Sequence, residues 1–99
     1  MVLEIAEFDI IPGQEEAFEA GVRQAVPLFK AARGYRSLSL RRIIEKPATY
    51  RLLVEWETLE DHTETFRNSD AFQTWRSLVG AFFAGPPRVD HSTLAVDAG

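Results

Sequence analysis

Residues 50–91 constrain the fold of this chain more than any other stretch. They contain both tryptophans, both histidines and four of the seven phenylalanines. At the start of the stretch, large side chains recur at every second position, which is the period of a β-strand. These residues are Tyr50, Leu52, Val54 and Trp56. The spacing predicts a strand over residues 49–57 with its bulky side chains on one face.

Two helix starts follow this strand. Residues 58–61 read Thr-Leu-Glu-Asp, which matches a capping box, and Ser69 is a typical N-cap for a second helix. The apolar stripe of that second helix runs through Phe72, Trp75, Val79 and Phe82. The Gly-Pro-Pro sequence at residues 85–87 ends the helix and leads into a last strand, expected over residues 88–96.

The first half of the chain supplies the remaining elements. A β-branched and aromatic run predicts a strand over residues 2–11, and Pro12-Gly13 ends it. Acidic residues and helical spacing then predict a helix over residues 14–32. Residues 35–45 form the next predicted strand, a hairpin partner of residues 49–57 through a turn at residues 46–48.

The order of these elements defines the expected fold. A single domain over residues 1–99 would run strand, helix, strand, strand, helix pair, strand. This is the α+β, ferredoxin-like split β-α-β plan: a four-stranded antiparallel sheet with helices on one face. The other face would be open, with Ala6, Phe8, residues 50–56 and Val89 available to cover it. We therefore expect a homodimer that pairs sheet faces.

Composition excludes several classes of function. The net charge of −4, with scattered basic residues, argues against binding nucleic acid. The absence of cysteine excludes disulfides, thiol catalysis and cysteine-based metal sites. No stretch approaches the length of a membrane span, and the N-terminus has no signal-peptide pattern. We expect a cytoplasmic protein that binds no membrane.

Neither histidine lies in a helical metal-binding pattern. The positions three and four residues after His62 are Thr65 and Phe66, so no metal site is predicted. No Gly-rich phosphate loop or nucleophile elbow is present either. His62 is expected at the surface of its short helix. His91, among apolar neighbours of the last strand, is either a structural histidine at the sheet edge or a general base in a pocket.

The aromatic residues are candidates for the walls of such a pocket. Trp75 lies on the buried helical stripe, where it either packs in the core or directs its N–H toward a ligand. Arg76 is expected to pair with an acidic group at the surface. Whether Tyr50 and Trp56 pack under the helices or face a partner subunit stays open, because alternation alone does not decide it.

The combined motifs resemble the antibiotic biosynthesis monooxygenase (ABM) family. They are V-E-W at residues 54–56, T-L-E-D-H at 58–62, F-R-x-S-x-A-F-Q-x-W at 66–75 and, after a Pro-Pro turn, V-D-H at 89–91. The resemblance covers nearly the whole chain. It implies a homodimeric α/β barrel in which each subunit has a cavity between sheet and helices. Enzymes of the family include cofactor-free oxygenases of phenolic polyketides, quinol monooxygenases and haem-degrading enzymes.

The chain also departs from this family. Many members carry histidines at the places held here by Phe66 and Ala71. The haem-degrading branch uses an Asn, a Trp and an axial His, where this chain has Ala6, Phe66 and Arg76. The resemblance therefore excludes haem degradation.

Two functions agree with this pattern. The first is a monooxygenase without cofactor that oxidises a phenol, anthrone or quinol, with His91 as base or donor. Its substrate-binding residues would be Trp75, Tyr35, Phe66, Phe72, Phe82 and Phe83. The second is a non-catalytic homodimer that binds a small apolar molecule or assists a biosynthetic pathway, since a fold does not carry its family's reaction with it.

Overall fold

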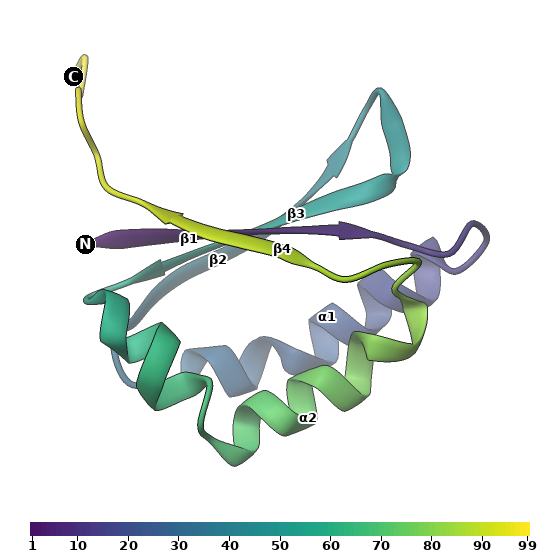
Figure 1. Cartoon of the computed structure of the whole chain (residues 1–99), viewed down its shortest axis with the longest axis horizontal. Coiled ribbons are helices and arrows are strands. Elements are labelled where there is room, and N and C mark those ends of the chain that lie inside the picture. The colour runs from purple at the N-terminus through teal and green to yellow at the C-terminus, as the bar shows by residue number, and fades with distance from the viewer.

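The computed structural model describes residues 1–99 and contains one four-stranded sheet with helices over one of its faces (Figure 1). The strands are β1 (Val2–Asp9), β2 (Tyr35–Ile43), β3 (Lys46–Trp56) and β4 (Arg88–Ser92). They lie in the order β2-β3-β1-β4, and all neighbours are antiparallel. The predicted α+β, ferredoxin-like fold is confirmed.

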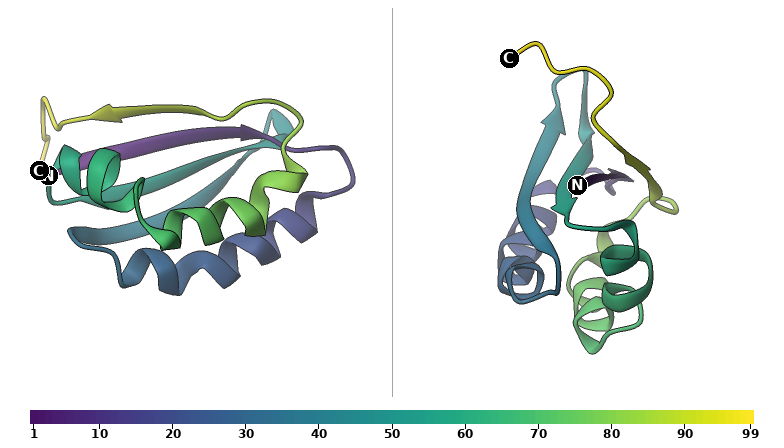
Figure 2. Two further views of the ribbon diagram at one scale, coloured as in Figure 1. Left: turned by 60° about the horizontal axis from the view of Figure 1, so that its bottom comes forward. Right: turned by 90° about the vertical axis from the view of Figure 1, so that its left-hand side faces the viewer.

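Two helices and two short turns complete the chain. They are α1 (Glu15–Lys30), the π-helical segment η1 (Asp61–Phe66), α2 (Asp70–Val79) and the 3-10 turn η2 (Gly80–Phe82). Figure 2 shows α1 and α2 side by side beneath the sheet, with the residues after β4 extending away from it. None of the helices is long and apolar enough to cross a membrane.

The predicted helix starts are confirmed in detail. The backbone N–H of Thr58 donates to the Asp61 carboxylate, and the Asp61 N–H donates to the Thr58 hydroxyl, both at 3.2 Å. The Ser69 hydroxyl accepts from the N–H of Phe72 at 3.2 Å and caps α2. These side chains satisfy backbone donors that have no partner within their helices.

The helix-facing side of the sheet forms the core. Tyr50, Leu52, Val54 and Trp56 of β3 are at most 1% exposed, and Ala6 and Phe8 of β1 lie beside them. The expectation that these residues cover the opposite face is therefore wrong. Alternation placed them on a common face, and packing against α1 and α2 decides which face it is.

The end of β4 and the turn between β2 and β3 differ most from the prediction. β4 ends at Ser92 instead of residue 96, because Ser92 pairs with Leu3 and β1 begins only one residue earlier, at Val2. The hairpin turn falls at residues 44–45, since Ile43 pairs with Lys46. Pro47 consequently lies within β3, and its carbonyl accepts a hydrogen bond from Arg42 instead of forming the turn.

Candidate functional site

The main candidate site is a cavity of about 710 Å³ on the helix-facing side of the sheet. Its walls come from β1, η1, α2 and the start of β4, with Phe29 contributed by α1. Most of the large wall side chains are aromatic. These are Phe8, Phe29, Phe66, Phe72, Trp75 and Phe83. A volume of this size with mainly apolar walls is typical of a small-molecule site.

Glu4 supplies a carboxyl group to this apolar cavity. It projects from β1 on the same face as Ala6 and Phe8 and is only 5% exposed. The indole N–H of Trp56 donates to Glu4 Oε1 at 3.0 Å, and His62 Nε2 lies 3.3 Å from the same oxygen. Burial raises the pKa of Glu4 to about 7, and the Trp56 hydrogen bond and the charge of Arg67 oppose that shift.

His62 lies between Glu4 and the last strand. It is 3% exposed and stacks on Trp56, with ring centroids 5.3 Å apart and an angle of 18° between the planes. Burial, with smaller contributions from the charges of Arg67 and His91, lowers the pKa of His62 to about 4. His62 is therefore a neutral imidazole near pH 7, and its 3.3 Å contact with Glu4 is not an ion pair at that pH.

His91 completes a continuous line of three titratable groups. Its Nε2 lies 2.8 Å from His62 Nδ1, and in the strand register it is the direct partner of Glu4. His91 is partly exposed, whereas the other two are buried. Burial, followed by the charge of Arg67, lowers the pKa of His91, and nearby Asp90 acts in the opposite direction.

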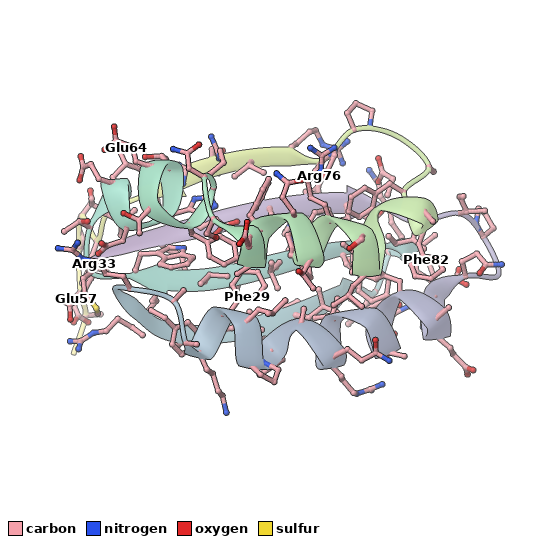
Figure 3. All side chains as sticks on the ribbon, turned by 90° about the horizontal axis from the view of Figure 1, so that it is seen from below. Phe29, Arg33, Glu57, Glu64, Arg76 and Phe82 are labelled. Carbon is pink, nitrogen blue, oxygen red and sulfur yellow. The ribbon has the colours of Figure 1, made fainter.

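Polar side chains from the residue after η1 and from α2 also line the cavity. Arg67, Gln73 and Arg76 line it, and neither arginine forms an ion pair within the chain. In Figure 3, Arg76 extends from α2 toward the strands. The expectation that Arg76 pairs with an acidic side chain is wrong. Both arginine side chains are exposed, and they add positive charge to the cavity wall.

The structure brings together most, but not all, of the residues predicted for a site. Trp75, Phe66, Phe72 and Phe83 line the cavity. His91 does not line it directly; it reaches the cavity through its hydrogen bond to His62. His62 itself, expected at the surface, is buried and lines the cavity.

Tyr35 and Phe82 are not part of the cavity wall. Tyr35 begins β2 at the opposite edge of the sheet and pairs with Trp56. Phe82 was placed by continuing the helical spacing of α2, but that helix ends at Val79 and the tighter turn η2 follows. The change of period carries Phe83 into the cavity, where it stacks on Phe8 with centroids 5.0 Å apart.

Sequence reasoning missed Glu4, although the sequence contains a signal for it. Glu4 is the one charged residue on a strand face that otherwise carries Val2, Ala6, Phe8 and Ile10. A charge on an apolar strand face that packs under helices must be buried, and buried carboxyls are uncommon without a function or a partner. No local pattern indicated that His62 is buried, because η1 has π-helical rather than α-helical spacing.

No group of three or more His, Cys, Asp or Glu side chains is arranged to hold a metal ion. The site consists of the neighbouring side chains of Glu4, His62 and His91 and of its aromatic walls.

Comparison with known proteins places the chain in a family. The profile of the family described as Antibiotic biosynthesis monooxygenase (ABM) matches residues 1–78, and the chain belongs to this family. It is 46% identical over 91 residues to the uncharacterized protein YczJ of Bacillus subtilis (strain 168), covering 92% of this chain and 96% of that protein.

Solved structures agree with this placement. A Bordetella bronchiseptica protein assigned to the antibiotic biosynthesis monooxygenases is 49% identical, with a TM-score of 0.94 and coverage of 96% of this chain and 97% of that one. SnoaB, a cofactor-independent oxygenase from Streptomyces nogalater, shares the fold at 15% identity, with a TM-score of 0.82 and coverage of 98% and 95%.

Proposed function

We propose that this protein is a cofactor-independent monooxygenase that oxidises a small phenol, anthrone or quinol in the aromatic cavity. The observation that carries the proposal is the buried Glu4–His62 pair at the wall of that cavity. Membership of the ABM family supports it, as does the shared fold with SnoaB, which is described as a cofactor-independent oxygenase.

The pair has the properties of a general base. Ionisation of a phenolic O–H gives an electron-rich phenolate, which molecular oxygen can oxidise. The proton acceptor should have a pKa near the working pH, and the pKa of Glu4, raised to about 7, meets this condition. The sequence-based proposal assigned this role to His91. We now assign it to Glu4 with His62, because these two line the cavity.

The reaction is balanced with molecular oxygen as the only oxidant. The phenol transfers its proton to Glu4, and the ring carbon of the phenolate forms a bond with oxygen. Glu4 returns the proton to the resulting peroxide anion, which gives a hydroperoxide at the ring carbon. The carbon–hydrogen bond is then broken and the oxygen–oxygen bond cleaves. One oxygen atom becomes the new carbonyl, and the other leaves with two protons as water. The substrate loses four electrons and oxygen accepts four.

The rest of the cavity fits a phenolate. Phe66, Phe72, Trp75 and Phe83 provide apolar surfaces for an aromatic ring. Arg67 and Arg76, which have no acidic partner in the chain, would stabilise the negative charge that develops on the ring oxygen. The cavity thus combines a base, an apolar wall and positive charge.

We also propose that the protein acts as a homodimer through the open sheet face. Leu3, Ile5 and Leu53 lie half-buried in the middle of that face. Ion pairs of Glu7 with Arg51 and Arg88 flank them. An apolar centre within a charged rim is the arrangement of many protein interfaces.

Oxygen consumption tests the enzymatic proposal. Metal-free purified protein is incubated with a panel of quinols, anthrones and phenols in an oxygen electrode, and the products are analysed after reaction with isotopically labelled oxygen gas. We expect turnover with at least one substrate and one labelled atom in its product. The alternative function, a ligand-binding homodimer, predicts that phenols bind in the cavity while no oxygen is consumed.

A further inference from the structure

We propose that Glu4, His62 and His91 form a proton relay that connects the cavity with solvent. A proton accepted by His91 at the surface would shift both hydrogen bonds of the chain and arrive at Glu4. The relay is a property of the resting protein; only its use in catalysis rests on the proposed function.

One link of this relay is a hydrogen bond in the resting structure, and the other is a close contact that a small movement of the Glu4 carboxyl would turn into one. Both ring nitrogens of the buried His62 are engaged: Nδ1 lies 2.8 Å from His91 Nε2, and Nε2 lies 3.3 Å from Glu4 Oε1. A neutral imidazole has one N–H donor and one acceptor nitrogen. His62 must therefore donate to one neighbour and accept from the other, so both hydrogen bonds point in the same direction along the chain.

Two complete arrangements satisfy this condition. With Glu4 ionised, His91 Nε2–H donates to His62 Nδ1, and His62 Nε2–H donates to Glu4. With Glu4 protonated, its O–H donates to His62 Nε2, and His62 Nδ1–H donates to His91 Nε2. The second arrangement contains one proton more than the first, carried on His91 Nδ1. The first arrangement becomes the second when His91 Nδ1 takes up that proton from solvent. At the same time the proton between His91 and His62 moves to His62, and the proton between His62 and Glu4 moves to Glu4.

Fixed contacts hold the chain in place while protons move. The Trp56 N–H donates to Glu4 Oε1 in both arrangements, and the Trp56 ring stacks on His62. The pairing of Glu4 with His91 across β1 and β4 sets the separation of the two ends. Glu4, His62 and His91 contain no buried side-chain nitrogen or oxygen that lacks a partner. The partly exposed His91 is the only one of the three that is not buried.

The charged groups around the chain direct the proton to Glu4. Arg67 acts on all three groups, and Asp90 acts on His91 from β4. Gln73 and Arg76 of α2 line the same cavity, whereas Asp61 of η1 turns away toward Arg33. Burial raises the pKa of Glu4 to about 7 and lowers that of His62 to about 4. The extra proton therefore resides on the carboxyl and not as an imidazolium.

Nitrogen NMR of the imidazole rings tests the relay without a substrate. In histidine-labelled protein, the relay predicts that both rings stay neutral on either side of the tautomer change. His62 should change from the Nε2–H tautomer at high pH to the Nδ1–H tautomer at low pH, with His91 following at the same midpoint near the pKa of Glu4. Glu4→Gln should abolish the change, and Glu64→Gln, at an exposed position of η1, should leave it intact.

Two results would overturn the relay. One is a single His62 tautomer at every pH, and the other is separate midpoints for the two rings, with either ring becoming an imidazolium. Both results are independent of turnover, so they leave the enzymatic proposal standing. Conversely, if His62 changes tautomer but the protein consumes no oxygen, the relay is supported and the proposed enzymatic function is contradicted.

If the protein turns over a phenol, His91→Ala gives a second readout. Removing the surface end of the relay should lower the rate about 100-fold in dilute buffer. Added imidazole, which can enter the vacated space and carry protons, should restore much of that rate. The same imidazole should not rescue Glu4→Gln. Equal effects of imidazole on both variants would contradict a relay that enters at His91.

Discussion

Glu4 and His62 are a pair of buried groups whose pKa values are shifted in opposite directions away from the values of the unfolded chain. The pKa of Glu4 rises from 4.5 to about 7, so its contribution to stability is complete below pH 4.5 and is lost as the pH rises through about 7. The pKa of His62 falls from 6.5 to about 4, so its contribution is complete above pH 6.5 and is lost as the pH falls through about 4. In the window they share, the two effects oppose each other.

A variant without the Glu4 carboxyl should separate the contribution of Glu4 to stability from that of His62. Glu4→Gln keeps the shape of the side chain but cannot ionise, so it avoids the cost of burying a carboxylate. We expect its free energy of unfolding, relative to the natural protein, to increase by about 2 to 3 kcal/mol between pH 5 and pH 8. Urea unfolding at the two pH values measures this difference.

The exposed Glu64→Gln substitution is the control, and its effect on stability should not depend on pH. A difference for Glu4→Gln that stays constant between pH 5 and pH 8 would show that Glu4 titrates in the folded protein much as it does in the unfolded chain.

Residue identities predicted the site only in part. The motif carrying Phe66, Phe72 and Trp75 indicated the aromatic wall correctly, because helical spacing gathers such residues on one face. His62 was placed at the surface, because its burial depends on the π-helical path of η1 and on contact with Trp56, which is distant in sequence. The role of Glu4 depends on tertiary contacts in the same way.

At the level of elements, α1 and α2 approach each other closely at a glycine. A Cβ atom on Gly21 would lie 2.7 Å from the carbonyl oxygen of Leu78 and 3.3 Å from Val79. The close approach holds α2 against α1. Helical periodicity predicted both helices and their buried stripes, but no sequence pattern could indicate how closely they pack.

Gly21→Ala should therefore destabilise the protein. The intrinsic gain in helix propensity, about 1 kcal/mol, is outweighed by a clash with backbone, and we expect a net loss of about 1 to 3 kcal/mol. Thermal unfolding measures it. Gly80→Ala is the matched control, because nothing lies within 4 Å of a Cβ at that position and its φ is −60°. Equal stability of the two variants would contradict close packing at Gly21.

The whole molecule has one sheet face covered by helices and one face open. Periodicity predicted this layered arrangement but left open which face carries the large β3 side chains, and the expected homodimer used them on the open face. The open face instead carries Leu3, Ile5 and Leu53 among charged pairs. In addition, the tail after β4 exposes Leu94 and Val96, which are 76% and 84% accessible. Such exposed apolar groups favour association with a second copy.

A charge placed in the centre of the open face should prevent that association. Leu53→Lys would put an unpaired ammonium group into the proposed interface, so we expect a monomer where the natural protein is a dimer. Light scattering coupled to size-exclusion chromatography gives the mass in solution. Leu59→Lys, at a 40% exposed position away from the open face, is the control. A monomeric natural protein, or a Leu53→Lys dimer of unchanged stability, would argue against this interface.

In the proposed oxygenase, the buried carboxyl of Glu4 is the base that accepts the phenolic proton. The most direct measurement is the oxygen-dependent turnover number of three proteins on one phenolic substrate: the natural chain, Glu4→Gln and Glu64→Gln. We predict a fall of about 100-fold or more for Glu4→Gln and an unchanged rate for Glu64→Gln. Folded Glu4→Gln that oxidises the substrate at the natural rate would contradict the claim.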